Sequence, residues 1–169
     1  AELVSVNSKT SVKASLDVDE NADIKIIGRL HEFVSRGGLK LKAALELFGV
    51  NVSDMIAIDI GASTGGFTDC LLQRGAAHVC AVDSGRGQLH PRLLEDIRVT
   101  SLEGFNARAL CPEDFGCFDV AVMDVSFISQ TLILPRIPAV LAEGGRLISL
   151  IKPQFEAGKS ALGKKGIVK

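Results

Sequence analysis

Three aspartates and one lysine stand at or near the ends of short apolar runs, namely Asp59, Asp83, Asp124 and Lys152. Short apolar runs without polar alternation are typical of parallel strands that are buried on both faces. The carboxyl ends of such strands meet at one edge of the sheet, where open α/β sheets bind ligands. We therefore expect one ligand-binding rim, where Asp83 accepts hydrogen bonds from both hydroxyls of a ribose and Lys152 directs a positive charge into a cleft.

A glycine-rich turn follows the first of these runs, in the sequence Asp-Ile-Gly-Ala-Ser-Thr-Gly-Gly-Phe of residues 59–67. Glycines at 61, 65 and 66 let the backbone turn sharply and approach a ligand closely. The spacing differs from the G-x-G-x-x-G of dinucleotide-binding proteins because residue 63 is serine, and from a phosphate-binding loop because no lysine follows Gly66. The pattern indicates a nucleoside-type cofactor without a pyrophosphate, of which S-adenosylmethionine is the commonest. A turn required only for packing is the structural alternative.

Other polar residues are open to two interpretations. Residues 35–40 combine glycine flexibility with Arg36 and Lys40, which suits either a phosphate contact or a solvated helix start. The Gly/Lys-rich residues 158–169 include Lys164 and Lys165 and allow the same two interpretations. Asn106 lies in a loop that, by its order in such folds, should pass the adenine ring of a nucleoside cofactor.

Length and composition limit the classes of protein that are compatible with the sequence. The 169 residues can form one medium-sized domain with a small appendage, and 47% of them are hydrophobic. A net charge of −1 gives no global basic signature, so a contact with nucleic acid has to be local. The sequence contains neither an apolar run long enough to span a membrane nor a signal peptide. These features predict a cytoplasmic protein.

Four cysteines are present, at positions 70, 80, 111 and 117. They lack C-x-x-C spacing, and most of them lie in or beside apolar runs, which favours buried, reduced thiols over disulfides or a zinc site. We therefore expect no metal.

Apolar runs and helical patterns alternate along most of the chain, which predicts an α/β fold with a doubly wound, mostly parallel sheet. Strands are expected over residues 55–60, 78–83, 98–102, 118–124 and 146–151. Helices are expected between Ser35 as the cap and Gly49, over residues 67–74, and from Pro91 to Asp96. A further helix is expected over 131–142, where Pro135 and Pro138 should start or bend it. Residues 1–28 differ, because they contain only a strand and turn at residues 4–9 and a second strand at 22–27.

Four motifs occur in an order that resembles the hemolysin A (TlyA-type) family. They are Val-Ser-Arg-Gly-Gly-Leu-Lys-Leu at 34–41, Asp-Ile-Gly-Ala-Ser-Thr-Gly-Gly-Phe-Thr-Asp at 59–69, Asp-Val-Ser-Phe-Ile-Ser at 124–129 and Ile-Lys-Pro-Gln-Phe-Glu at 151–156. Members of this family are similar to FtsJ-type ribose 2′-O-methyltransferases fused to an N-terminal S4 RNA-binding domain, and they methylate cytidine riboses in ribosomal RNA. The resemblance implies an S4-like remnant at residues 1–28, a linker at 29–34, and a methyltransferase domain of the S-adenosylmethionine-dependent type at 35–169, incomplete at its C-terminus.

The same resemblance implies roles for individual residues. The family's Lys-Asp-Lys-Glu catalytic set carries over as Lys40, Asp124 and Lys152, with its glutamate expected beyond Lys169 because Glu156 follows Lys152 too closely. A chain without that glutamate and without a whole S4 domain should be a poor enzyme. The expected S-adenosylmethionine site comprises Asp59, Gly61, Ala62, Ser63, Gly65, Gly66, Phe67, Asp83 and Asn106. The expected contacts to ribosomal RNA or ribosomal subunits are Arg36, Lys40, Lys164 and Lys165.

The chemistry of a ribose 2′-hydroxyl agrees with this set. The pKa of the hydroxyl is too high for attack at neutral pH, so a nearby cation has to lower it and a carboxylate has to orient the cation or take the proton. The sulfonium methyl group is already activated, so in-line positioning is the main task of the protein and no metal is required. A cofactor- and RNA-binding module without activity is the alternative, and a membrane-lytic protein is a remote one.

Overall fold

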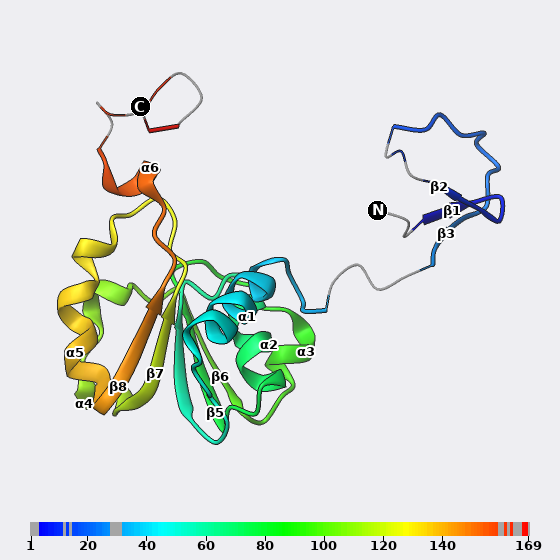
Figure 1. The fold of residues 1–169 in the computed structure, drawn as a ribbon. Helices are drawn as coiled ribbons and strands as arrows, with labels where there is room; N and C mark the ends of the chain where they lie inside the picture. Colours follow the sequence, from blue (N-terminus) through cyan, green and yellow to red (C-terminus); the bar gives the residue numbers. More distant parts are fainter. Residues whose placement is uncertain are drawn as a thin grey trace. The chain divides into compact units, whose positions relative to one another are not determined.

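The structure is a computed structural model that describes residues 4–11, 13, 15–27, 32–158, 161, 163 and 167–168. The chain divides into two compact units, residues 1–32 and 33–169 (Figure 1). The assignment of the first residues to an S4-like domain stays a prediction.

The first unit contains a three-stranded antiparallel sheet in the order β2-β1-β3. Its strands are β1 (Val4–Val6), β2 (Lys9–Ser11) and β3 (Ile24–Ile26). Asn7 and Ser8 both have positive φ angles, of 50° and 64°, which suits a tight two-residue hairpin turn between β1 and β2. The sequence indicated β1, the turn and β3, but β2 was not predicted because Lys-Thr-Ser contains no apolar residue.

The second unit is built on a parallel five-stranded sheet in the order β6-β5-β4-β7-β8. Its strands are β4 (Ile56–Ile60), β5 (His78–Asp83), β6 (Val99–Glu103), β7 (Phe118–Met123) and β8 (Leu141–Ser149). The strand β4, which comes first in the sequence of this unit, lies at the centre of the sheet. The strand order reverses between β4 and β7. The predicted doubly wound, parallel α/β fold is therefore confirmed.

Helices cover both faces of this sheet (Figure 1). One face carries α1 (Gly37–Phe48), α2 (Gly66–Gln73) and α3 (Pro91–Leu94), and the other carries α4 (Pro112–Phe115) and α5 (Ile137–Val140). The strands supply apolar side chains to both faces: in β7, Val120 and Val122 belong to the first core, and Ala121 and Met123 to the second. This arrangement explains why these strands have continuous apolar runs.

Short elements complete the second unit. They are the 3₁₀ turns η1 (Ala107–Ala109), η2 (Gln130–Leu132) and η3 (Leu134–Arg136), and the helix α6 (Pro153–Glu156).

The helix α1 begins at Gly37 rather than beside Ser35, whose Oγ accepts the Gly37 N–H at 3.3 Å. It ends, as predicted, at Gly49 in a left-handed conformation with φ of 62°.

The predicted helix over residues 131–142 is wrong. The structure has two 3₁₀ turns and one short helix there, and β8 already begins at Leu141 instead of Arg146. Pro135 and Pro138 explain the interruption, because proline lacks an N–H and its ring clashes with the preceding turn of a helix. The pairing with β7 shifts register between Phe118 and Val120, so the residues before Arg146 form an irregular start of the strand.

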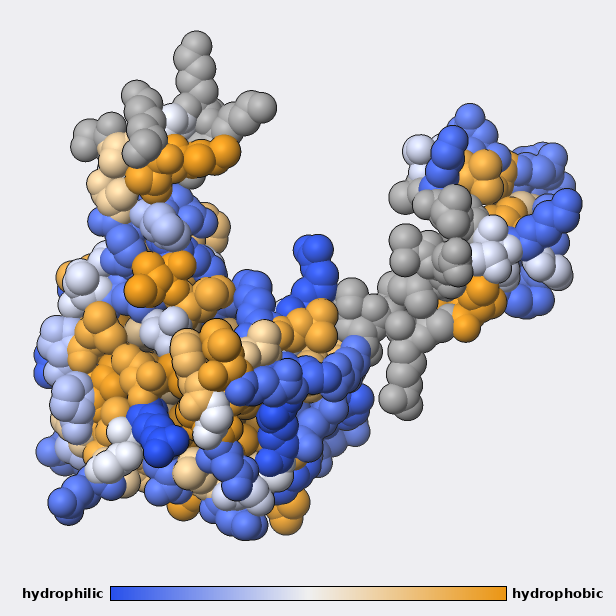
Figure 2. Space-filling view, viewed as in Figure 1, coloured by the Kyte–Doolittle hydropathy of each residue, from blue (hydrophilic) through white to orange (hydrophobic). Residues whose placement is uncertain are grey.

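The sheet in the described part of the chain ends at β8, and apolar residues gather over β8 and α5 on the face that Figure 2 shows. Leu141, Leu147 and Ile148 of this strand are only partly buried against the two cores.

The four cysteines differ in burial. Cys70 and Cys80 are buried and not in disulfides, as expected, whereas Cys111 is half-buried and Cys117 is exposed. Within the described ranges, no three side chains of His, Cys, Asp or Glu are grouped as a metal ion would require. The helices of those ranges also include none with the length and apolar character needed to cross a membrane.

Candidate active site

The glycine turn lies where the strand order reverses. Gly61 has a φ of 85° and its N–H donates to the Val82 carbonyl at 2.8 Å. A β-carbon at this position would lie 3.1 Å from the Asp124 carbonyl oxygen, so only glycine lets the turn pass this close to the end of β7. The structure thus brings together the two strand ends that form the crevice of a doubly wound sheet.

Gly65 and Gly66 have a different function in the turn. A β-carbon at Gly65 would collide with the Leu93 side chain, and one at Gly66 would collide with Ser35 Oγ. These two glycines are therefore required for packing against α3 and the start of α1, which was the structural alternative for the turn. Gly61 alone of the three is held against Asp124.

A cavity of about 430 Å³ opens beside the turn. Its lining includes Gly61, Ser63, Asp83 and Asn106, which are four of the residues predicted to bind the cofactor. The Asp83 carboxylate accepts the N–H of Ser63 at 2.8 Å and that of Gly85 at 2.7 Å. It therefore joins the turn to the loop after β5. The volume lies within the range of about 300–1,000 Å³ that is typical of small-ligand sites.

Glu103, at the end of β6, shapes one wall of this cavity and was not predicted to do so. Its carboxylate accepts the N–H groups of Gly87, Gln88 and Leu89 at 2.7, 2.7 and 3.1 Å. The hydrogen bond from Gln88, followed by those from Gly87 and Leu89, lowers the pKa of Glu103 below its usual value. The sequence contained a signal, because Glu103 also follows a strand of the same sheet, as Asp83 and Asp124 do.

A second cavity, of about 190 Å³, adjoins the first. The two share Gly61, Ser63, Asp124 and Ser126. Lys152 lines only the smaller cavity, as do the predicted residues Ala62, Gly66 and Phe67. A ligand in the larger cavity and a substrate in the smaller one would therefore meet beside Asp124.

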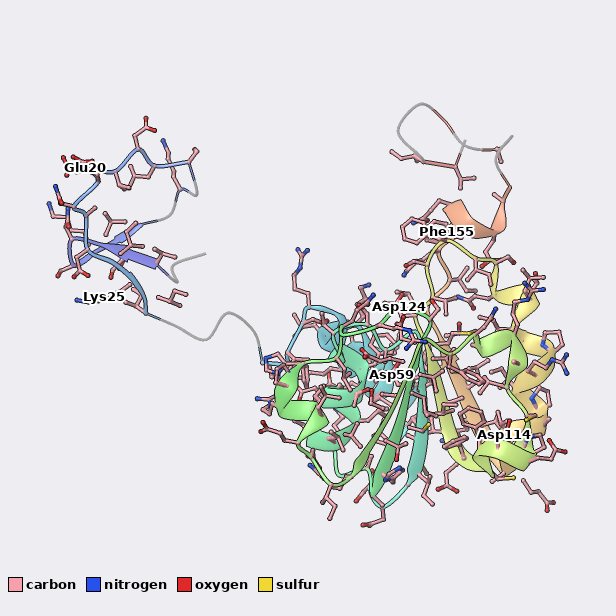
Figure 3. The ribbon with its side chains drawn as sticks, turned by 180° about the vertical axis from the view of Figure 1, so that it is seen from behind. Glu20, Lys25, Asp59, Asp114, Asp124 and Phe155 are labelled. Atoms are coloured by element: carbon pink, nitrogen blue, oxygen red, sulfur yellow. The ribbon has the colours of Figure 1, made fainter. Side chains whose placement is uncertain are left out.

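Asp124 lies between two lysines (Figure 3 labels Asp124 at the carboxyl edge of the sheet). Lys152 Nζ is 2.5 Å from Asp124 Oδ1, outside hydrogen-bonding geometry, and donates a hydrogen bond to Ser126 Oγ at 2.6 Å. Lys40 Nζ donates to Asp124 Oδ2 at 3.2 Å. The Lys152 side chain is 20% exposed and that of Lys40 is 49% exposed, so Lys152 is the more enclosed of the two ammonium groups. The two lysines and Asp124 together carry one net positive charge.

Asp59 is placed differently from its prediction. It is fully buried beneath the turn, and Oδ2 accepts the N–H and the hydroxyl of Thr68 at 2.9 and 2.7 Å. Its Oδ1 has no hydrogen-bond partner among the described residues, and Asp59 lines neither cavity. Burial, partly offset by the bonds to Thr68 and reinforced by Asp124 and Asp83, raises the pKa of Asp59 to about 7.

Of the four cations predicted to contact RNA, the structure describes Arg36 and Lys40. Arg36 is exposed and precedes the first residue of α1, and it lines neither cavity. Lys40 contacts Asp124 and is the only one of the four predicted cations that the structure joins to the rim within the described part of the chain. Lys164 and Lys165 lie outside the described residues.

Ser126 is a site residue that sequence reasoning missed. It lines both cavities and receives the hydrogen bond of Lys152. Its position two residues after Asp124, within the motif at 124–129, was the available signal.

Several known proteins resemble this chain in sequence and fold. The FtsJ-like methyltransferase family matches residues 33–169. YqxC of Bacillus subtilis is 47% identical over the whole chain, which covers 61% of that protein. The 16S/23S rRNA (cytidine-2′-O)-methyltransferase TlyA of Mycobacterium tuberculosis is 42% identical over 98% of the chain and 62% of that protein. A solved structure from Streptococcus thermophilus, which carries the name hemolysin, is 48% identical with a TM-score of 0.82 over 99% of this chain and 62% of its own. The chain thus spans about three fifths of the length of these relatives.

Proposed function

Because this chain belongs to the FtsJ-like methyltransferase family, we propose that it transfers a methyl group from S-adenosylmethionine to a ribose 2′-hydroxyl of ribosomal RNA. The TlyA relative supports cytidine as the nucleoside, since its name specifies cytidine-2′-O methylation of ribosomal RNA. The observation that carries the proposal is the pair of lysines on Asp124, at the junction of a cavity of about 430 Å³ with a smaller one. We also propose a cytoplasmic location, because ribosomal RNA is the proposed substrate.

The larger cavity fits S-adenosylmethionine by its donors and acceptors. Asp83 offers a carboxylate for the ribose hydroxyls, and Asn106 offers an amide near the adenine. Gly61 and Ser63 provide close backbone approach for the methionine end, where the Gly61 position has no room for a β-carbon. When bound, this cofactor supplies a methyl group that its sulfonium already activates for transfer.

The smaller cavity would hold the acceptor ribose beside Lys152. The Lys152 ammonium would stabilise the 2′-oxygen as the hydroxyl gives up its proton to solvent water. Asp124 and Ser126 fix the position of that ammonium through contacts of 2.5 and 2.6 Å. Lys40 binds the other oxygen of Asp124, so the carboxylate does not neutralise the positive charge of the rim. The arrangement lowers the pKa of an attacking hydroxyl and aligns it with the methyl group.

Binding of the polyanionic substrate depends on local cations, since the net charge of the chain is −1. Arg36 and Lys40 lie at the start of α1, and we propose that they contact phosphates near the acceptor nucleotide. Lys164 and Lys165 are proposed to add to this contact.

Transfer of tritiated methyl groups to ribosomal subunits by the complete native protein tests this proposal. Lys152→Ala and Asp124→Ala should each lower the rate about 100-fold or more, whereas the affinity for S-adenosylmethionine in calorimetry should stay within about threefold. Lys42→Ala is the matched control, because Lys42 is on the same helix as Lys40 but lines neither cavity. A folded Lys152→Ala protein with wild-type activity would refute the mechanism. Wild-type protein that binds the cofactor but methylates no RNA would favour the non-catalytic module.

A further inference from the structure

Glu156, the last residue of α6, is bound to the loop that follows β7. Its carboxylate accepts the Ser129 hydroxyl at 2.5 Å and the Gln130 N–H at 2.9 Å. The hydrogen bond from Gln130, followed by that from Ser129, lowers the pKa of Glu156, so the side chain is ionised at neutral pH. Each carboxylate oxygen of Glu156 therefore accepts a hydrogen bond from a residue that is distant in the sequence.

A second connection joins the same two segments on the other side of Lys152. Gln130 is only 5% exposed, and its Nε2 donates to the Leu150 carbonyl at 2.6 Å. Its Oε1 accepts the hydroxyl of Ser149, the last residue of β8. We call these bonds, together with those of Glu156 to Ser129 and Gln130, the Glu156–Gln130 clasp.

The segments that the clasp joins carry the reactive charges. Asp124 and Ser126 belong to the loop after β7, and Lys152 lies between the two connections of the clasp, after Leu150 and before Glu156. Packing in these segments is uneven, because Val125 is buried and Ile128 packs against the core, whereas Phe127 is 92% exposed and Ile151 is 68% exposed.

Phe155 of α6 adds one apolar contact. Its ring lies 5.3 Å from that of Phe127, and Figure 3 shows it beyond the carboxyl edge of the sheet, on the side of Asp124. Because the residues next to Lys152 are exposed on this side, its position relative to Asp124 depends on its own contacts with Asp124 and Ser126 and on the hydrogen bonds of the clasp.

We propose that Glu156 is a positioning residue, which holds Lys152 against Asp124 and Ser126 by binding α6 to the loop after β7. The role in catalysis rests on the proposed function, methyl transfer to RNA. This role assigns no proton transfer to Glu156, because both carboxylate oxygens already accept hydrogen bonds from the protein.

Two substitutions distinguish positioning from proton chemistry. Glu156→Gln keeps an oxygen that can accept the Gln130 N–H, and its amide can donate to the Ser129 hydroxyl, which then acts as the acceptor. Glu156→Ala removes both bonds. A positioning role therefore predicts that Glu156→Gln retains most of the methyl-transfer rate. If Glu156 accepted a proton instead, both variants would lose the rate equally.

The experiment uses the complete native protein with Glu156→Ala, Glu156→Gln and, as a control, Glu143→Ala at an exposed position of β8. Single-turnover methyl transfer should fall about 10- to 100-fold in Glu156→Ala and less than about threefold in the other two. The affinity for S-adenosylmethionine should fall much less than the transfer rate in Glu156→Ala, because Glu156 lines neither cavity although residues 124–128 of the loop that it binds line the larger one. The affinity should be unchanged in the other two variants. Hydrogen exchange should be faster in residues 124–130 and 149–157 of Glu156→Ala only.

Several results would overturn the inference. Equal loss of transfer in Glu156→Gln and Glu156→Ala would assign proton chemistry to the carboxylate. Wild-type transfer in Glu156→Ala would show that the clasp is dispensable. A loss of cofactor affinity as large as the loss of transfer would show that the clasp shapes the cofactor cavity instead of positioning Lys152. If the wild-type protein methylated no RNA, the proposed function would fail, whereas hydrogen exchange and melting curves would still decide whether Glu156 holds the two segments together.

Discussion

Replacing Asp59 by asparagine should remove a pH dependence of the stability of the second unit. Asp59 is fully buried, and its pKa is raised from 3.8 to about 7, first by burial. The folded state therefore binds more protons than the unfolded state between these two values. Stability that is fully present below about pH 4 is lost as the pH rises toward 7 and is constant above it.

The expected size of this loss follows from the shift in pKa. One pKa unit corresponds to about 1.4 kcal/mol, so the loss for Asp59 totals about 4 kcal/mol, of which about 3 kcal/mol falls between pH 5 and pH 8. Asparagine can still accept the two bonds from Thr68, and its amide group takes the place of the unpartnered Oδ1. Protonated aspartate and asparagine both place an unpaired hydrogen-bond donor at the Oδ1 position. The free-energy cost of that unpaired donor is therefore similar in the two proteins.

Urea denaturation of the cofactor-free wild type and of Asp59→Asn, from about pH 5 to pH 8, measures this effect. The stability of Asp59→Asn relative to the wild type should increase by about 3 kcal/mol over this range and reach a plateau above pH 7. Asp17→Asn, at an exposed residue of the first unit, is the control for a general effect of charge. A difference between wild type and Asp59→Asn that does not change with pH would show that Asp59 is ionised throughout and that burial does not raise its pKa.

Three further predictions concern the cofactor cavity and the turn. Asp83→Ala should weaken S-adenosylmethionine binding in calorimetry at least about tenfold, and equal affinity in a folded variant would remove Asp83 from the site. Glu103→Ala should also weaken binding, because the loop at residues 87–89 loses its three bonds, while Glu103→Gln should retain part of the affinity; identical affinities in all three proteins would contradict this. Gly65→Ala should lower the free energy of unfolding by about 2–4 kcal/mol, since Gly65 has a φ of 90° and faces Leu93, and unchanged denaturation would show that the turn can adjust.

Strand-end residues were the part of the site that the sequence could predict. An apolar run followed by an acid indicates a strand and its carboxyl end together, so Asp83, Asp124 and Lys152 could be assigned to one rim before the fold was known. Lys40 was different, because 84 residues separate it from Asp124. Its place in the set came from the family resemblance, and the structure then joined the two side chains.

Side-chain direction limited the prediction for Asp59. Side chains alternate between the faces of a strand, so Asp59 points to the opposite face from Ile58 and Ile60. On that face it meets Thr68 at the start of α2 rather than the cavity. A strand with apolar residues on both faces gives no sequence signal that distinguishes an inward from a ligand-facing aspartate.

Tertiary hydrogen bonds explain the remaining differences. The bonds of Glu156 to Ser129 and Gln130 span 27 and 26 residues, and no local pattern specifies them. The stretch at 131–142 has apolar residues at helical spacing, but Pro135 and Pro138 divide it into short turns. Local periodicity predicted the wrong element there because the backbone constraint of proline was stronger.

The position of the transferred methyl group tests the central claim most directly. The complete native protein would methylate ribosomal subunits with S-adenosylmethionine, and the RNA would then be hydrolysed with alkali, which does not cleave the phosphodiester next to a 2′-O-methylated ribose. The account predicts labelled, alkali-resistant dinucleotides from the wild type and from Lys42→Ala, and none from Lys152→Ala or Asp124→Ala. A label found on a base, or alkali-resistant dinucleotides from a folded Lys152→Ala protein at the wild-type level, would contradict it.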